Sequence, residues 1–127
     1  MKKLILASLL LWPVSQVSAA DCDNAETQLE MNQCANADYK KADKELNSTY
    51  QQVLKSTSGE QTALFRKAQK KWIEYRDADC QFQTFASREG SVNSMNIGLC
   101  LKAKTEQRTK ELKDMLSCHE GDVSCPL

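Results

Sequence analysis

Residues 64–82 have the sequence LFRKAQKKWIEYRDADCQF. Apolar side chains recur in this stretch at steps of three and four, as Ala68, Trp72 and Tyr75 illustrate. Such spacing places the apolar positions on one stripe of an α-helix. The pattern predicts a long helix that runs from about residue 58 to residue 86.

The sequence before this stretch predicts another long helix. Apolar positions between residues 26 and 55 follow the same spacing, and they are Met31, Ala35, Tyr39, Ala42, Leu46, Tyr50 and Val53. The polar segment 56–59 then ends this helix. Ser58, followed at the third place by Gln61, matches the capping box with which a following helix begins.

A third, shorter helix follows a second break at residues 88–94. Apolar positions recur at helical spacing from Ile97 to Leu116, whereas the tail from about Cys118 has no periodicity. We therefore expect an all-α fold, a small three-helix bundle in which the long first two helices are antiparallel.

A register follows from the turn between the first two helices. Because both helices rise about 1.5 Å per residue, residues whose numbers add up to roughly 114–116 lie at the same height. Large side chains then face small ones, as interdigitating cores prefer. The level residues are Ala42 with Trp72, Leu46 with Ala68, and Tyr50 with Leu64 or Phe65.

The first 20 residues look like a secretory signal peptide. Lys2 and Lys3 precede an apolar run and then the small-residue stretch 17–20, which is the order of such a signal. We expect cleavage after Ala19 or Ala20, leaving residues 21–127 as a single domain that is periplasmic or secreted. The apolar run has nine residues, whereas about 20 are needed to cross a bilayer, so we expect no membrane insertion.

The charge of the mature chain excludes some classes of partner. Loss of the signal peptide leaves 15 basic and 17 acidic residues, which gives a net charge of −2. This balance argues against a nucleic-acid binder and suits a basic partner. Nothing in the sequence indicates the oligomeric state.

The even number of cysteines predicts three disulfides in an exported small domain. They are Cys22, Cys34, Cys80, Cys100, Cys118 and Cys125. The helix register puts Cys34 level with Cys80, so we expect that pair. Twelve residues of mostly helix would hold Cys22 about 15 Å from Cys34, which favours Cys100 as its partner. Cys118 and Cys125 then close a small C-terminal loop.

The sequence offers little for catalysis or metal binding. Its one histidine, His119, lies beside Cys118, and no C-x-x-C pair occurs. We expect no enzyme activity, no metal and no cofactor. Asp77 and Asp79 could form the paired carboxylates of a glycosidase. Residues two apart on a helix point to different faces, however, so we do not favour that site.

Two groups of polar residues remain to be explained. The register of the first two helices puts Asp38 level with Arg76, and a second hairpin about residue 92 puts Arg108 beside Arg76 and Thr105 beside Asp79. Structural ion pairing is the simpler explanation for these five residues, and a recognition patch is the alternative. They are Asp38, Arg76, Asp79, Thr105 and Arg108.

The short polar loop between the second and third helices is a candidate partner-binding loop, although a plain connector is an equal alternative. Its candidate residues are Arg88, Glu89, Gly90, Ser91 and Asn93.

Three segments resemble the LprI-type lysozyme-inhibitor family of bacterial envelope proteins. The first is Glu30-Met31-Asn32-x-Cys34-Ala35, the second is Trp72-x-x-Tyr75-Arg76-Asp77-x-x-Cys80, and the third is Cys100 with Thr105 and Arg108. The resemblance runs from about Cys22 to Leu116. The chain has Glu89-Gly90 where the family often has two adjacent glycines, and Cys118 and Cys125 lie outside the shared region.

The resemblance implies an exported, helical, non-enzymatic protein that binds lysozyme and blocks its cleft sterically, with the loop from Arg88 to Asn93 as the candidate contact. Lysozymes are typically strongly basic, so a slightly acidic inhibitor meets no bulk repulsion. The alternatives are an immunity-type protein against another peptidoglycan hydrolase and a periplasmic adaptor that binds an envelope component.

Overall fold

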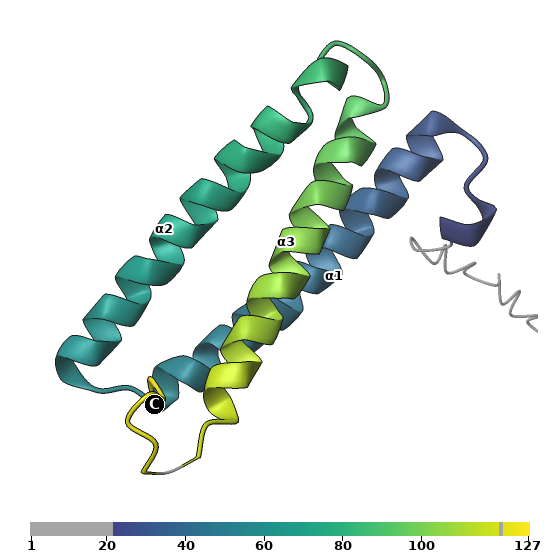
Figure 1. Cartoon of the computed structure of the whole chain (residues 1–127). Coiled ribbons are helices and arrows are strands. Elements are labelled where there is room, and N and C mark those ends of the chain that lie inside the picture. Colours follow the sequence, from purple (N-terminus) through teal and green to yellow (C-terminus); the bar gives the residue numbers. More distant parts are fainter. Residues whose placement is uncertain (1–21, 120) are drawn as a thin grey trace, which may run out of the picture.

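The computed structural model of the chain describes residues 22–119 and 121–127. The expected signal peptide and its cleavage site lie outside these residues. The elements are η1 (Cys22–Asn24), α1 (Gln28–Lys55), α2 (Gly59–Gln83), η2 (Phe85–Ser87) and α3 (Asn93–Leu116). The described part of the chain contains no strand, which confirms the all-α, three-helix fold. Figure 1 shows that α1 and α3 run in the same direction and that α2 runs opposite to both.

A capping box begins α1 and not α2. The Thr27 hydroxyl accepts a hydrogen bond from the Glu30 amide at 3.1 Å, and the Glu30 carboxylate accepts one from the Thr27 amide at 3.1 Å. The prediction that Ser58 and Gln61 form a capping box at the start of α2 is wrong. Ser58 makes no side-chain cap, and the Gln61 side chain donates to the Pro126 carbonyl in the tail.

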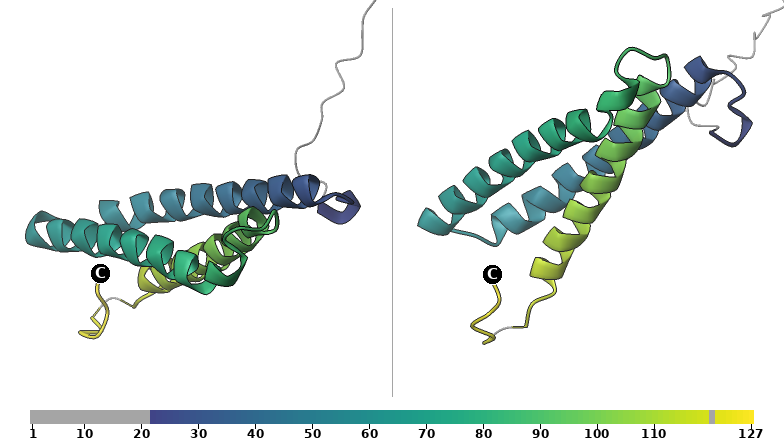
Figure 2. Two further views of the ribbon diagram at one scale, coloured as in Figure 1. Left: turned by 90° about the horizontal axis from the view of Figure 1, so that it is seen from above. Right: turned by 45° about the horizontal axis from the view of Figure 1, so that its top comes forward.

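The closest helix pair is α1 with α3 rather than α1 with α2 (Figure 2). Gly98 on α3 lies against the backbone of Ala35 on α1, where a Cβ on Gly98 would be 3.2 Å from the Ala35 Cβ. Two residues with almost no side chain allow the backbones to approach this closely. This contact brings the N-terminal halves of the two parallel helices together.

The apolar core lies toward the opposite end of the bundle. Leu46, Val53 and Leu112 are almost completely buried there. Other side chains packed against them are Tyr50, Phe65, Trp72, Met115 and Leu116. The Tyr50 and Phe65 rings stack with their centroids 5.0 Å apart, which confirms that part of the expected register.

Few side chains of α2 are fully buried. They are Gln69, Arg76 and Cys80, so this helix is attached by polar contacts and a disulfide as much as by apolar packing. Ala68, which we expected opposite Leu46, is exposed.

Two of the three expected disulfides are paired differently. Cys22 bonds to Cys34, with Cα atoms 5.4 Å apart, and Cys80 bonds to Cys100, with Cα atoms 5.7 Å apart. Cys22 reaches Cys34 because α1 starts only at Gln28, which lets the preceding residues fold back. Cys34 and Cys80 do not pair because Cys34 is taken by Cys22 and because α2 makes its disulfide with α3. The pair Cys118–Cys125 is confirmed.

Gly98 provides a test of the α1–α3 contact. Gly98→Val should lower the free energy of unfolding by about 1–3 kcal/mol, because the new side chain overlaps backbone atoms of Ala35 that cannot rotate away. Urea denaturation measures this change. Gly90→Ala is the control, with a change within about 0.5 kcal/mol, because its Cβ would meet the Ser87 carbonyl oxygen at 3.4 Å and the Val92 side chain at 3.8 Å, both ordinary contact distances. Equal stability of the two variants would contradict the close approach.

Candidate protein-binding end of the bundle

One end of the bundle gathers the N-termini of α1 and α3 and the C-terminus of α2 (Figure 1). We call it the disulfide end and define it as residues 22–39 and 77–101. It contains the Cys22–Cys34 and Cys80–Cys100 disulfides. The candidate partner-binding loop therefore lies between the end of one stapled helix and the start of another.

Hydrogen bonds to Ser87 hold the loop in one shape. The Ser87 hydroxyl lies 2.9 Å from the Thr84 carbonyl oxygen and 3.0 Å from the Asn93 side-chain oxygen, and it accepts a hydrogen bond from the Asn96 amide group at 3.1 Å. The Gly90 amide donates to the Ser87 carbonyl at 2.8 Å. The loop is therefore internally bonded.

Two asparagines of α1 fix the loop to the bundle. The Asn32 side chain donates to the Ser91 carbonyl at 2.9 Å, and the Asn36 side chain donates to the Ser94 hydroxyl at 3.0 Å. The sequence analysis named Asn32 only within the first family-like segment and did not name Asn36, and it gave neither residue a role at the loop. Amide side chains one turn apart on a helix face were a signal that could have indicated this role.

The predicted loop residues have two different roles. Arg88, Glu89, Gly90 and Ser91 are exposed, whereas Asn93 is half-buried with its side-chain oxygen beside Ser87. The guanidinium of Arg88 lies 3.9 Å from the centroid of the Phe85 ring and donates to the carbonyl of that residue. Asn93 thus shapes the loop, and its exposed neighbours are the residues available to a partner.

Arg76 is a buried cation at the centre of the bundle. Its guanidinium donates to Asp77 at 3.0 Å and to the Thr105 hydroxyl at 3.3 Å, and it lies 3.5 Å from Asp43. The Trp72 ring centroid is 5.3 Å from its central carbon. Thr105 thus contacts Arg76, and Asp43 and Asp77 are partners that the register did not indicate.

The other members of the predicted polar cluster bind elsewhere. Asp38 pairs with Lys102 at 3.8 Å, and Asp79 pairs with Lys104. Arg108 donates to Gln69 and Glu111, although its guanidinium shares the Trp72 ring with Arg76. The five predicted residues therefore form several small groups along the bundle, and the two lysines were missed.

The two carboxylates considered for glycoside hydrolysis have separate partners. Asp77 accepts from Arg76, and Asp79 accepts from Lys104 and Gln83. The Lys104 hydrogen bond lowers the pKa of Asp79 below its ordinary value. A general acid needs the opposite shift, because it must be protonated near neutral pH. This pair does not converge on one substrate atom.

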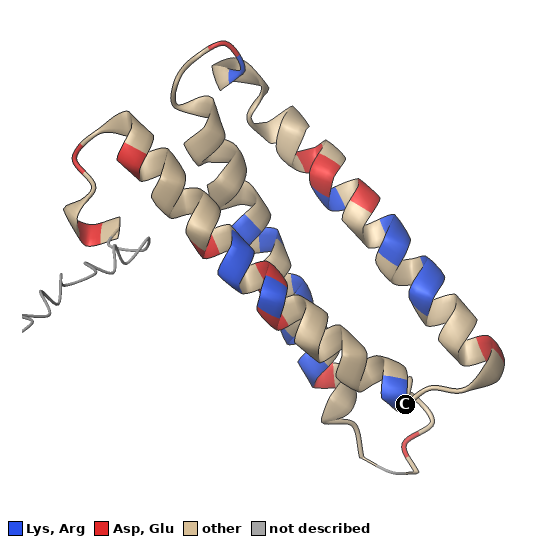
Figure 3. Ribbon diagram, turned by 180° about the vertical axis from the view of Figure 1, so that it is seen from behind, with Lys and Arg blue, Asp and Glu red and all other residues tan. Residues whose placement is uncertain are grey.

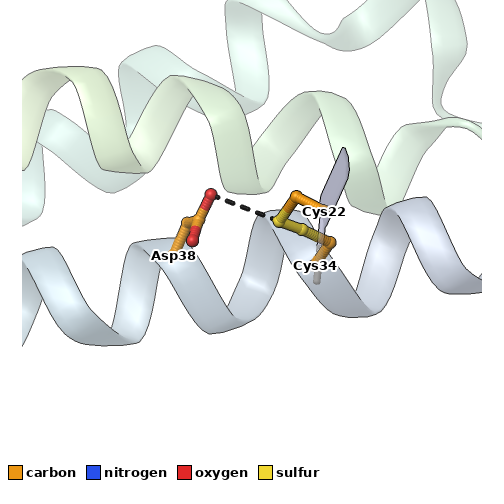
Figure 4. A group of neighbouring side chains, drawn as sticks. All are labelled: Cys22, Cys34 and Asp38. Carbon is orange, nitrogen blue, oxygen red and sulfur yellow. Dashed lines mark hydrogen bonds between the residues drawn. A yellow bond between two sulfur atoms is a disulfide. The ribbon is translucent and has the colours of Figure 1, made fainter. Parts of the chain in front are cut away.

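Cys22, Cys34 and Asp38 are close enough to resemble a metal site (Figure 4). The two sulfur atoms are bonded to each other, so neither carries the thiolate charge that metal coordination requires. The Asp38 carboxylate lies 3.6 Å from the Cys22 sulfur, which has no proton to donate in a disulfide. The three residues are a disulfide with a neighbouring carboxylate rather than a ligand set.

The geometry defines a class of protein, a slender disulfide-stapled helical bundle that presents a rigid polar loop. None of the helices among the described residues combines the length and apolar character needed to cross a bilayer. The model of the family described as "Lysozyme inhibitor LprI" matches residues 19–112. The chain belongs to this family, and membership implies a lysozyme-inhibitor-like function in an exported envelope protein.

The chain also resembles a curated protein whose function is not described. A protein of Rhizobium meliloti (strain 1021), described as uncharacterized, is 35% identical over 120 residues, which cover 84% of this chain and 86% of the relative. No solved structure matches the chain.

Arg76 should be the most sensitive polar residue of the bundle. Arg76→Leu should lower the free energy of unfolding by about 2–4 kcal/mol, since it removes a buried cation from its hydrogen bonds and aromatic contacts. Chemical denaturation measures the loss. Arg66→Leu on the exposed side of α2 is the matched control, with an expected change within about 0.5 kcal/mol. Equal losses would show that α2 does not depend on Arg76.

The Asp79–Lys104 pair predicts a pH dependence. The pKa of Asp79 is lowered and that of Lys104 is raised, so the pair stabilises the fold between the two ordinary values, 3.8 and 10.5. Asp79→Asn should lower the urea midpoint near neutral pH. The difference from wild type should disappear as the pH falls below the lowered pKa of Asp79. A difference that is constant down to strongly acidic pH would contradict the ion pair.

Proposed function

We propose that the mature chain, cleaved after residue 19 or 20, is a periplasmic or secreted inhibitor of a lysozyme-type muramidase. Inhibition is steric, and the loop from Arg88 to Asn93 covers the substrate cleft. The supporting observation is that this loop is exposed yet held by hydrogen bonds from Ser87 and from two asparagines of α1. A loop fixed before binding loses little conformational entropy in the complex.

The exposed side chains of the loop suit a cleft that binds sugars. Muramidases carry a pair of carboxyl groups beside the scissile bond. The Arg88 guanidinium is a planar donor that matches a carboxylate, and it is held in place by the Phe85 ring. The Ser91 hydroxyl is exposed and can take the place of a sugar hydroxyl in hydrogen bonding.

The three disulfides suit an exported inhibitor. Disulfides form and persist in oxidising compartments, and a domain of this size gains stability from them.

The purified, oxidised mature chain should inhibit at least one class of lysozyme in a muramidase assay, and a fully reduced sample should inhibit less. Absence of inhibition in every class would contradict the proposal.

The loop itself is tested by substitution. Arg88→Ala and Ser91→Ala should each raise the inhibition constant about tenfold or more, the loss typical of a central interface contact. Gly90→Ala adds a methyl group to the exposed loop, next to the Ser87 carbonyl oxygen and the Val92 side chain, and should also weaken inhibition by changing the loop surface that meets the partner. Arg66→Ala, on the part of α2 far from the loop, is the control and should leave the constant unchanged. Unchanged constants for all three loop variants would remove the loop from the interface.

A further inference from the structure

An open apolar groove lies between η1, the first turns of α1 and the first turns of α3. Its walls are formed by Ala25, Met31, Ala35, Met95 and Leu99, together with the Cys22–Cys34 disulfide and the Asp38 carboxylate. The groove has a volume of about 180 Å³. None of the residues that line it belongs to α2.

The close helix contact explains why the groove stays open. Gly98 against Ala35 draws the two helices together and leaves the larger side chains on either side without a third helix to cover them. Leu99 keeps 48% of its surface exposed. Methionine side chains such as Met31 and Met95 adapt their shape to an incoming apolar group. An apolar surface of this kind marks a contact site for a partner.

The charges around the groove indicate the chemistry of that partner. Residues 22–39, which form two of its sides, contain four acidic and no basic residues. Residues 40–76, which lead away from the disulfide end, contain nine basic and four acidic residues. Figure 3 shows acidic positions along the N-terminal part of α1 and η1, with basic positions farther along the helices. Lys102, 3.8 Å from Asp38, is the cation paired at the groove.

We infer that this groove receives an apolar side chain from the cationic surface of a lysozyme. Asp23, Glu26 and Asp38 would face basic side chains that flank it. The inference rests on the proposed function and adds a second contact to the loop. Opposite charges at the rim guide the encounter, and the apolar floor supplies contact area. The groove and the loop belong to the same disulfide end, so one partner can cover both.

A second copy of the chain is the competing occupant. The basic segment 40–76 of one molecule could meet the acidic groove of another in a head-to-tail contact. Such a contact does not form a symmetric dimer and would produce rings or open filaments. Sedimentation of the oxidised protein separates this occupant from a lysozyme.

The test uses the full mature protein and a lysozyme that the wild type inhibits. Leu99→Lys places a positive charge in the groove at an exposed position. Asp23→Asn with Glu26→Gln removes two exposed acidic charges that follow the lining residues Cys22 and Ala25 in the sequence. Calorimetric titration at several salt concentrations should show dissociation constants raised about tenfold for Leu99→Lys and about fivefold for the double variant, with a weaker salt dependence for the latter. Circular dichroism and disulfide mapping check that each variant is folded.

The control is Lys67→Gln with Lys70→Gln, which changes two charges on the exposed part of α2. Its dissociation constant should stay within about twofold of the wild type. If both groove variants bind like the wild type, the groove is overturned while the proposed function stands. If the wild type binds no lysozyme, both fail. If it self-associates and the groove variants do not, the occupant is a second copy and the inference is overturned.

Discussion

The attachment of α2 is the constraint on which the rest of the structure depends. α1 and α3 pack closely by themselves, because Gly98 has no side chain and lies against the backbone and the methyl group of Ala35. α2 buries few apolar side chains and is held by the Cys80–Cys100 disulfide and by the buried cation Arg76. In the chain-entropy description, closing this 20-residue separation is worth about 3 kcal/mol, a large share for a domain with a small core.

This arrangement separates the stabilising core from the proposed binding surface. The apolar cluster around Leu46, Val53 and Leu112 lies toward one end, and the disulfides Cys22–Cys34 and Cys80–Cys100 rigidify the other. The disulfide end can therefore expose a polar loop and an apolar groove without depending on them for stability. At this end, the two disulfides supply stability that apolar packing supplies at the other end.

The helices were readable from the sequence, whereas the disulfide pairing was not. The spacing of apolar residues indicates each helix separately, so it located α1, α2 and the end of α3, where the tail begins. It does not say which helices lie closest. The predicted pairing of Cys34 with Cys80 assumed that α2 is the nearest neighbour of α1, whereas the contact at Gly98 makes α3 the nearer helix. Thr27-x-x-Glu30 in the sequence is the capping box that starts α1 late and frees Cys22 to reach Cys34.

The sequence located the loop between α2 and α3 but not the hydrogen bonds that shape it. Exposed loop residues such as Arg88 and Ser91 lie where the break in periodicity indicated. Asn93 instead contacts Ser87 and helps to hold the shape of the loop, and Ser87 was not among the predicted residues.

Hydrogen–deuterium exchange of the complex with an inhibited lysozyme tests the whole account most directly. We predict slower exchange at residues 22–39 and 84–99 on binding. Slower exchange confined to residues 40–76 would contradict it.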